Sequence, residues 1–157
     1  MRINLLCIGK TDDKKITELI SYYIARLPKH WNFEMIEIPD AKNARNLSSD
    51  LLKKEEAKLF FNHIENTDLV ILLDEKGKEF TSREFAQKLN YYQNNSIKKV
   101  CFLIGGAYGF SEEMYNRANE KLSLSKMTFT HQMIRLFFVE QIYRADQILQ
   151  GKPYHND

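Results

Sequence analysis

Cysteine, proline and glycine are all scarce in this chain of 157 residues, which contains 2, 3 and 6 of them. Two cysteines without a Cys-x-x-Cys pair cannot build a disulfide framework, so we expect a reducing compartment. Cys7 and Cys101 both lie inside apolar runs, where a free thiol behaves as a small hydrophobic side chain. No repeat, linker or low-complexity segment interrupts the sequence, which therefore predicts a single domain over residues 1–157.

Long apolar runs and a strong charge of either sign are also absent. No run is long enough to span a bilayer, and the first residues lack the pattern of a signal peptide, so we expect a cytoplasmic protein. The net charge of +2 is only a weak indication of a nucleic-acid partner, because a dedicated binder carries a basic patch. The hydrophobic share of 43% and the charged share of 28% exclude a disordered chain.

Strand and helix patterns alternate along the chain. Apolar runs and one alternating pattern predict strands at residues 3–8, 33–38, 69–73 and 100–104, and a short segment around 122–124. Apolar spacing and capping residues predict helices at about 13–27, 48–64, 82–94, after Ser111, and at 131–149, with a turn at Lys76-Gly77. The candidate caps are Asp12 or Asp13 for the first helix, Ser48, Ser49 or Asp50 for the second, Thr81 with Glu84 for the third, and Ser111 for the fourth. This order predicts an α/β fold with a mostly parallel sheet and helices on both faces.

Three loops are the places where this fold would bind a ligand. Ligands of open parallel sheets bind beyond the carboxyl ends of the strands, which here are the loops after Leu73, Ile104 and Leu124. In the second loop, Gly105 and Gly106 let a ligand approach the backbone because no Cβ intervenes. A tight turn from strand to helix explains the same glycines equally well.

The third loop combines backbone groups with apolar walls. Apolar and small polar residues alternate from 122 to 130 and then enter a helix at His131, an arrangement that suits a purine-sized ligand. Taken alone, the pattern is better explained by an edge strand followed by a capped helix.

Two pairs of polar residues mark the long helix at 131–149. Glu140 and Arg144 are one turn apart, as are His131 and Arg135, and the two pairs point to nearly opposite sides of the helix. If all four residues matter, a second protomer has to complete the site. An ordinary surface ion pair is the alternative explanation for Glu140 and Arg144. The helix also carries an apolar stripe, which we expect to be core or subunit interface and which consists of Ile134, Phe138, Ile142, Ala145 and Leu149.

The last residues could also contribute chemistry. Tyr154 can stack on a base, and the imidazole of His155 can donate or accept a proton near neutral pH. Without further information a frayed terminus is the better explanation.

Other classes of enzyme fit less well. The four histidines show no metal-ligand spacing, no nucleophile elbow is present, and the glycine spacing is not that of a dinucleotide site. Asp74 and Glu75 follow a strand and face opposite ways, so they do not form an acid pair.

The motifs together resemble one family over essentially the whole chain. It is the SPOUT class of methyltransferases that methylate N3 of a pseudouridine in bacterial large-subunit ribosomal RNA (the RlmH family). The matching segments are Cys7-Ile8-Gly9-Lys10, Ile38-Pro39-Asp40, and residues 104–109, 122–129, 131–135, 139–145 and 154–155. One departure is Thr130, where the family usually has proline, and we expect it to loosen the start of the helix.

The resemblance implies a C-terminal trefoil knot, a homodimer and bound S-adenosyl-L-methionine. Its cofactor positions coincide with the three loops chosen from the sheet alone. With the adjacent Gly106 from the glycine motif, they are Leu73, Gly105, Gly106, Leu124, Ser125, Lys126, Met127, Thr128 and Phe129.

The resemblance also implies a target, ribosomal RNA in the large subunit or the assembled ribosome, with no metal. The protein has to remove the N3 proton, and the candidate bases are His155, Glu140 and His131, of which we favour His155 or a water that it orients. Tyr154 would position the pyrimidine, and Arg144 and Arg135 would hold phosphate or a developing oxyanion. The alternatives are a non-catalytic RNA-binding module with a vestigial cofactor pocket and, less well supported, a nucleotide-dependent oxidoreductase.

Overall fold

The computed structural model describes residues 1–154 and contains a five-stranded sheet in which every neighbouring pair is parallel. The strand order is β2-β1-β4-β3-β5, so β1, β4 and β3 lie in the interior and β2 and β5 form the edges. The strands are β1 (Arg2–Ile8), β2 (Phe33–Ile38), β3 (Leu69–Glu79), β4 (Lys99–Ile104) and β5 (Glu120–Ser123). The predicted α/β class with a parallel sheet is confirmed.

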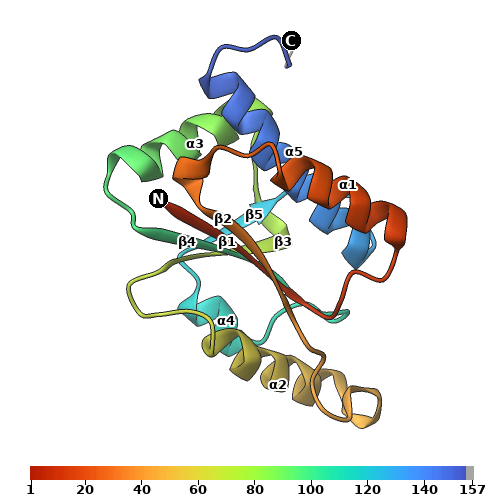
Figure 1. Ribbon diagram of the computed structural model, residues 1–157. Coiled ribbons are helices and arrows are strands. Elements are labelled where there is room, and N and C mark those ends of the chain that lie inside the picture. Colours follow the sequence, from red (N-terminus) through yellow and green to blue (C-terminus); the bar gives the residue numbers. More distant parts are fainter. Residues whose placement is uncertain (155–157) are drawn as a thin grey trace.

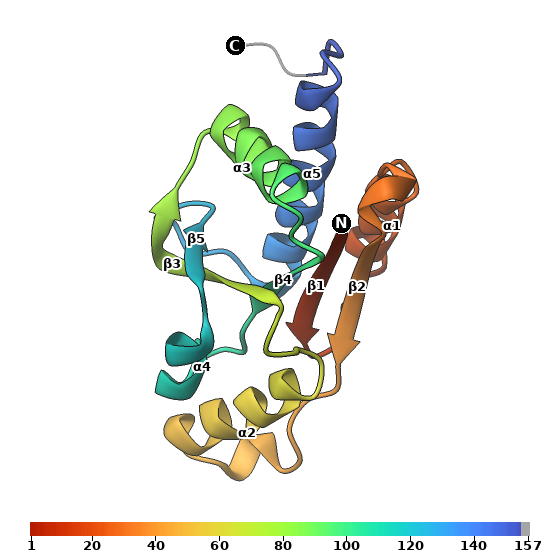
Figure 2. The ribbon, with the colours of Figure 1, turned by 90° about the vertical axis from the view of Figure 1, so that its left-hand side faces the viewer.

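Helices cover both faces of the sheet (Figures 1 and 2). Helices α1 (Lys14–Ile24), α3 (Ser82–Asn94) and α5 (His131–Leu149) pack on one face, and α2 (Ser49–Phe61) and α4 (Glu112–Arg117) pack on the other. Two short 3₁₀ turns, Lys29–Trp31 and Ala44–Asn46, flank β2. Within residues 1–154, no helix is both long and apolar enough to cross a membrane.

Alternation along β1 explains how two cores form around one sheet. Ile3, Leu5 and Cys7 pack against α1, α3 and α5, whereas Leu6 and Ile8 pack against α2 and α4. Successive strand residues point to opposite faces, so a continuous apolar run is needed where both faces are covered. On α5 the predicted stripe is core at Phe138, Ile142 and Ala145, but its last member, Leu149, is 40% exposed.

Helix starts lie where the capping residues predicted them. The side chains of Asp13, Ser48 and Ser111 each accept a hydrogen bond from a first-turn backbone N–H, and Thr81 forms a capping box with Glu84. Two helix ends were predicted too late: α1 ends at Ile24 and α2 at Phe61.

The predicted turn at Lys76-Gly77 is wrong, because β3 continues through these residues to Glu79. The strand changes its pairing with β5 by a shift of register between Leu73 and Lys78. A Cβ on Gly77 would lie 2.6 Å from the carbonyl carbon of Leu122, so this glycine permits close contact between two strands rather than a reversal of the chain.

Candidate functional site

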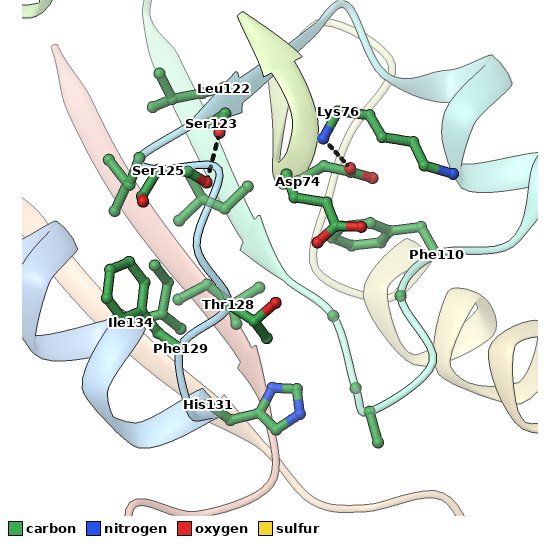
Figure 3. A pocket seen from close by; sticks show the side chains of 18 of the residues that line it. Asp74, Lys76, Phe110, Leu122, Ser123, Ser125, Thr128, Phe129, His131 and Ile134 are labelled. Carbon is green, nitrogen blue, oxygen red and sulfur yellow. Dashed lines mark hydrogen bonds between the residues drawn. The ribbon is translucent and has the colours of Figure 1, made fainter. Parts of the chain in front are cut away.

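The three predicted loops converge on one cavity of about 410 Å³ beside the N-terminus of α5 (Figure 3). Its walls come from the bulge of β3, the glycine turn after β4, and the segment that joins β5 to α5. This volume lies within the range of about 300 to 1,000 Å³ that is usual for small-molecule sites. Of the predicted cofactor positions, the cavity is lined by Leu73, Gly105, Gly106, Leu124, Ser125, Met127, Thr128 and Phe129.

Lys126 is the predicted position that does not line the cavity. Its side chain is 86% exposed, and its Nζ lies 3.9 Å from an oxygen of Glu79. Only its backbone remains part of the loop that borders the pocket.

The glycine turn after β4 is closed by a hydrogen bond from the amide of Gly109 to the carbonyl of Gly106, at 3.0 Å. Gly109 has a φ of +75°, a conformation that side chains with a Cβ rarely adopt. A Cβ on the buried Gly105 would lie 3.2 Å from both the carbonyl oxygen of Gly109 and the ring of Phe110. The turn is therefore tight in itself, and it also brings bare backbone to the cavity.

Two serines shape the segment between β5 and α5. The hydroxyl of Ser123 donates to the carbonyl of Ser125 at 3.0 Å, and the hydroxyl of Ser125 accepts from the amide of Met127 at 2.9 Å (Figure 3 shows the first bond). These short-range bonds set the path of the backbone, while Leu122 and Ile134 supply apolar wall.

The acidic side of the cavity was missed by sequence reasoning. Asp74 and Glu75 both line the cavity, although alternation predicted that they would face opposite ways. The register shift in β3 breaks that alternation. Asp74 accepts hydrogen bonds from the amide of Lys76 and from the hydroxyl of Tyr115, whose pKa rises to about 12 through burial and the bond to Asp74.

Thr130 caps α5 instead of loosening it. Its hydroxyl accepts a hydrogen bond from the amide of Met133 at 3.3 Å, which satisfies one of the unpaired donors of the first turn. The expectation of a loose helix entry is therefore wrong, because threonine replaces the fixed φ of proline by a side-chain cap. The next residue, His131, points its ring toward the glycine turn (Figure 3).

His131 is expected to titrate below the ordinary histidine pKa of 6.5. Desolvation at the pocket wall and, to a lesser extent, the positive charge of Arg135 lower its pKa. The stabilisation that comes from the neutral ring is complete above pH 6.5 and is lost as the pH falls through 6.5 toward the lower pKa of the folded state. Proton chemical shifts of the His131 ring, followed from pH 8 to pH 4 at roughly half-unit steps, measure this pKa; a value above that of the unfolded chain would contradict the assignment.

Arg135 is 1% exposed and faces the end of β1. Its Nη2 donates to the carbonyl of Ile8 at 2.6 Å, its Nη1 donates to the hydroxyl of Thr11 at 2.9 Å, and Glu37 lies 3.6 Å away. These contacts use the guanidinium to join α5 to β1 and the loop that follows it.

Glu140, Arg144 and Tyr154 form a second cluster, away from the cavity. Arg144 Nη2 lies 2.6 Å from Glu140 Oε1, and the hydroxyl of Tyr154 donates to the same oxygen at 3.0 Å. The ring of Tyr154 packs on Tyr143 with centroids 4.9 Å apart, and burial raises the pKa of the Tyr154 phenol. The tail is therefore packed up to Tyr154, whereas frayed ends are the general expectation.

Helix geometry separates this second cluster from the cavity of the same chain. Glu140 follows His131 by nine positions on α5, which is about 13 Å along the axis. None of Glu140, Arg144 and Tyr154 lines the cavity. The predicted base His155 lies outside the described residues.

A metal site is not apparent in the part of the chain that the structure describes, where no three His, Cys, Asp or Glu side chains gather in a group that could hold an ion. The cavity offers backbone groups, apolar walls and the acidic bulge of β3. Such a site suits an organic ligand with a polar end.

Comparison with known proteins gives full-length matches. A family model described as "Predicted SPOUT methyltransferase" matches residues 1–155. A protein of Cytophaga hutchinsonii named "Ribosomal RNA large subunit methyltransferase H" is 53% identical over 156 residues, 99% of this chain and 100% of the relative. Proteins of the same name from Christiangramia forsetii and Parabacteroides distasonis are each 50% identical and cover at least 99% of both chains. These matches include every strand and all three pocket loops, and the chain belongs to the family of SPOUT methyltransferases, enzymes that require a methyl donor.

Proposed function

We propose that the protein transfers a methyl group from S-adenosyl-L-methionine to N3 of a pseudouridine in the 23S ribosomal RNA of the large subunit. The observation that carries the proposal is the convergence of the bulge of β3 and the loops after β4 and β5 on one cavity. The names of the relatives supply the class of substrate. The trefoil knot that the resemblance implies is part of this proposal, as is a location in the cytoplasm.

The cavity fits the proposed donor in three respects. Gly105 and Gly106 expose backbone that a purine or a carboxylate can approach, and Leu122 and Ile134 provide apolar walls for a ring. Asp74 and Glu75 place negative charge at the cavity edge, which favours a cationic ligand. S-adenosyl-L-methionine supplies an already activated methyl group, so metal assistance is not required.

The protein's own chemical task is then to align the pyrimidine and to take up the N3 proton. An imide nitrogen is a poor nucleophile until it loses that proton, which calls for a general base. We assign the role of general base to His155. Tyr154 positions the pyrimidine, and Arg144 stabilises negative charge on the pyrimidine. His131 is the base already at the cavity wall, and its lowered pKa keeps the ring neutral near pH 7.

The separation of the two clusters supports a homodimer, which is part of this proposal. The tail of one chain packs beside Glu140, on the part of α5 that lies beyond the cavity, so we infer that a partner's tail completes each site. Apolar side chains near the cavity are available for such a contact: Met127 is 75% exposed, and Phe129 and Phe137 are each 37% exposed and pack edge to face.

Calorimetry tests the donor site directly. We expect purified protein to bind S-adenosyl-L-methionine with one site per chain, and replacement of Gly105 by valine to abolish the heat, because the branched side chain would meet Phe110. The control Lys126→Ala removes an exposed side chain of the pocket segment between β5 and α5 and is expected to bind as the unaltered protein does. Absence of heat from the unaltered protein would instead favour the non-catalytic RNA-binding module.

The substrate is expected to be a folded particle rather than a short RNA. A net charge of +2 per chain supplies little of the non-specific attraction that draws proteins to free RNA. Shape contacts with the large subunit or the assembled ribosome are therefore expected to supply the binding energy.

A further inference from the structure

Glu56 occupies an apolar stripe of α2. It is 6% exposed and follows Leu52 and precedes Phe60 at the spacing of one helical turn, and both of these neighbours are buried. A hydrophobic residue would satisfy this pattern better, because removing a carboxylate from water is costly unless polar partners receive it. Burial is also the main reason that the pKa of Glu56 is raised, with a smaller contribution from the charge of Asp40.

The partner of this carboxylate is the glycine turn of the cavity. The backbone N–H of Gly106 interacts with the carboxylate of Glu56, and this interaction lowers the pKa of Glu56 against the effect of burial. A Cβ on Gly106 would lie 2.2 Å from Oε1 and 2.6 Å from Oε2 of the same carboxylate. The contact therefore reaches from a helix on the α2–α4 face to a loop that lines the proposed donor site.

Backbone conformation does not explain why residue 106 is a glycine. The glycines with positive φ are Gly9, Gly109 and Gly151, and Gly106 is not among them. At Gly105 the crowding atoms belong instead to Gly109 and Phe110. The carboxylate of Glu56 is thus the obstacle at position 106, and it is an obstacle that a substitution in α2 can remove.

We propose that Glu56 is a positioning residue for methyl transfer: by accepting the N–H of Gly106 it holds the glycine turn in the shape that admits the methyl donor. The inference rests on the proposed function of the cavity. A hydrogen bond to this N–H fixes the peptide plane that joins Gly105 to Gly106, and both of these residues line the site. Glu56 itself does not line the cavity, so it acts through the turn rather than by touching the donor.

A double-mutant cycle tests the proposal, with calorimetric binding of S-adenosyl-L-methionine as the readout. Gly106→Ala is expected to weaken binding strongly, because the new methyl group collides with the carboxylate and displaces the turn. Glu56→Ala alone loses one hydrogen bond and is expected to weaken binding by roughly fivefold to tenfold. In the double variant the collision is gone. Its Kd is therefore expected to be at least about tenfold lower than the Kd calculated for two single substitutions that act independently.

Three controls distinguish positioning from a general loss of structure. Gly105→Ala crossed with Glu56→Ala is expected to show no coupling, since Glu56 is not among the atoms that crowd position 105. Glu56→Gln retains an oxygen that can accept the N–H and is expected to bind within about threefold of the unaltered protein. Glu55→Ala changes the preceding residue, which pairs with Lys58 on the helix surface, and is expected to leave binding unchanged.

Each result has a defined meaning. Two results overturn the role of Glu56 while the proposed function stands. One is that Glu56→Ala and Gly106→Ala lower the affinity for the donor independently of each other, and the other is that Glu56→Gln binds the donor as weakly as Glu56→Ala. A variant whose affinities for donor and for ribosomal subunits fall together also overturns it, because positioning of the donor loop predicts loss of donor affinity alone. Failure of the unaltered protein to bind the donor overturns both proposals.

Discussion

Replacing His155 by alanine is expected to slow methyl transfer by about 10²- to 10⁴-fold, the usual contribution of a general base, while the Kd for S-adenosyl-L-methionine stays the same. The proposed role of the imidazole is to remove the proton from N3, and it does not include contact with the donor. Single-turnover methylation of large ribosomal subunits, followed with labelled donor, measures the effect. Lys152→Ala, at an exposed position of the same tail, is the matched control and is expected to leave the rate unchanged.

A mixture of two inactive variants separates a tail supplied by the partner from a tail supplied by the same chain. His155→Ala removes the proposed base, and Gly105→Val closes the donor cavity. If the tail crosses between subunits, a mixed dimer contains one site with neither change, and exchange of subunits restores part of the rate. Full turnover by His155→Ala alone would remove His155 from the mechanism, and no recovery in the mixture would argue for a tail that serves its own chain.

Replacing Arg135 by alanine is expected to lower the free energy of unfolding by about 3 kcal/mol, which corresponds to a fall in Tm of roughly 6 to 12 °C. The substitution leaves the carbonyl of Ile8 and the side chains of Thr11 and Glu37 without the guanidinium that now joins them, and it opens a cavity under α5. Thermal unfolding followed by circular dichroism measures the loss.

The same variant distinguishes two roles for Arg135. A phosphate-binding arginine would weaken affinity for the ribosomal subunit at unchanged Tm, which is the result that the buried geometry argues against. Lysine at this position keeps the charge but cannot make both hydrogen bonds in the plane of the guanidinium, so an intermediate Tm is expected. Lys126→Ala removes an exposed positive charge near the cavity and serves as the control for charge alone.

Features that depend on neighbouring residues in the sequence were predicted well. Asp13, Ser48, Thr81 and Ser111 lie within three residues of the backbone amides that they cap, so the chemistry is complete in a few positions. The pocket segments after β4 and β5 also follow from order alone, since parallel strands joined by helices have all their carboxyl ends on the same edge, whereas the segment after Leu73 is a bulge within β3 and not the predicted loop. The resemblance to a family then gave the expected cofactor positions, all of which except Lys126 line the cavity.

Features that depend on distant residues were not predicted. Gly77 resembles a turn until Leu122 is placed against it, 45 positions later in the chain. Asp74 and Glu75 both line the cavity, and they lie where the pairing of β3 with β5 shifts register, between Leu73 and Lys78. The error at Thr130 has a different cause. The expectation considered only the loss of proline and left out that a threonine side chain can itself cap a helix.

The order of apolar runs, glycines and capping residues thus determined the α/β class and the edge of the sheet at which the cavity lies. Periodicity and caps act over a few residues and locate the strands and helices. The alternation of strands and helices then places the carboxyl ends of the strands at one edge of the sheet, whatever the side-chain contacts are. Tertiary structure alone decided that Arg135 is buried against β1, that Tyr154 packs far from its own cavity, and that Glu56 lies beneath Gly106. Each of these three arrangements depends on the packing of elements from separate parts of the chain. The burial and the hydrogen bonds that stabilise each arrangement form only when those elements come together.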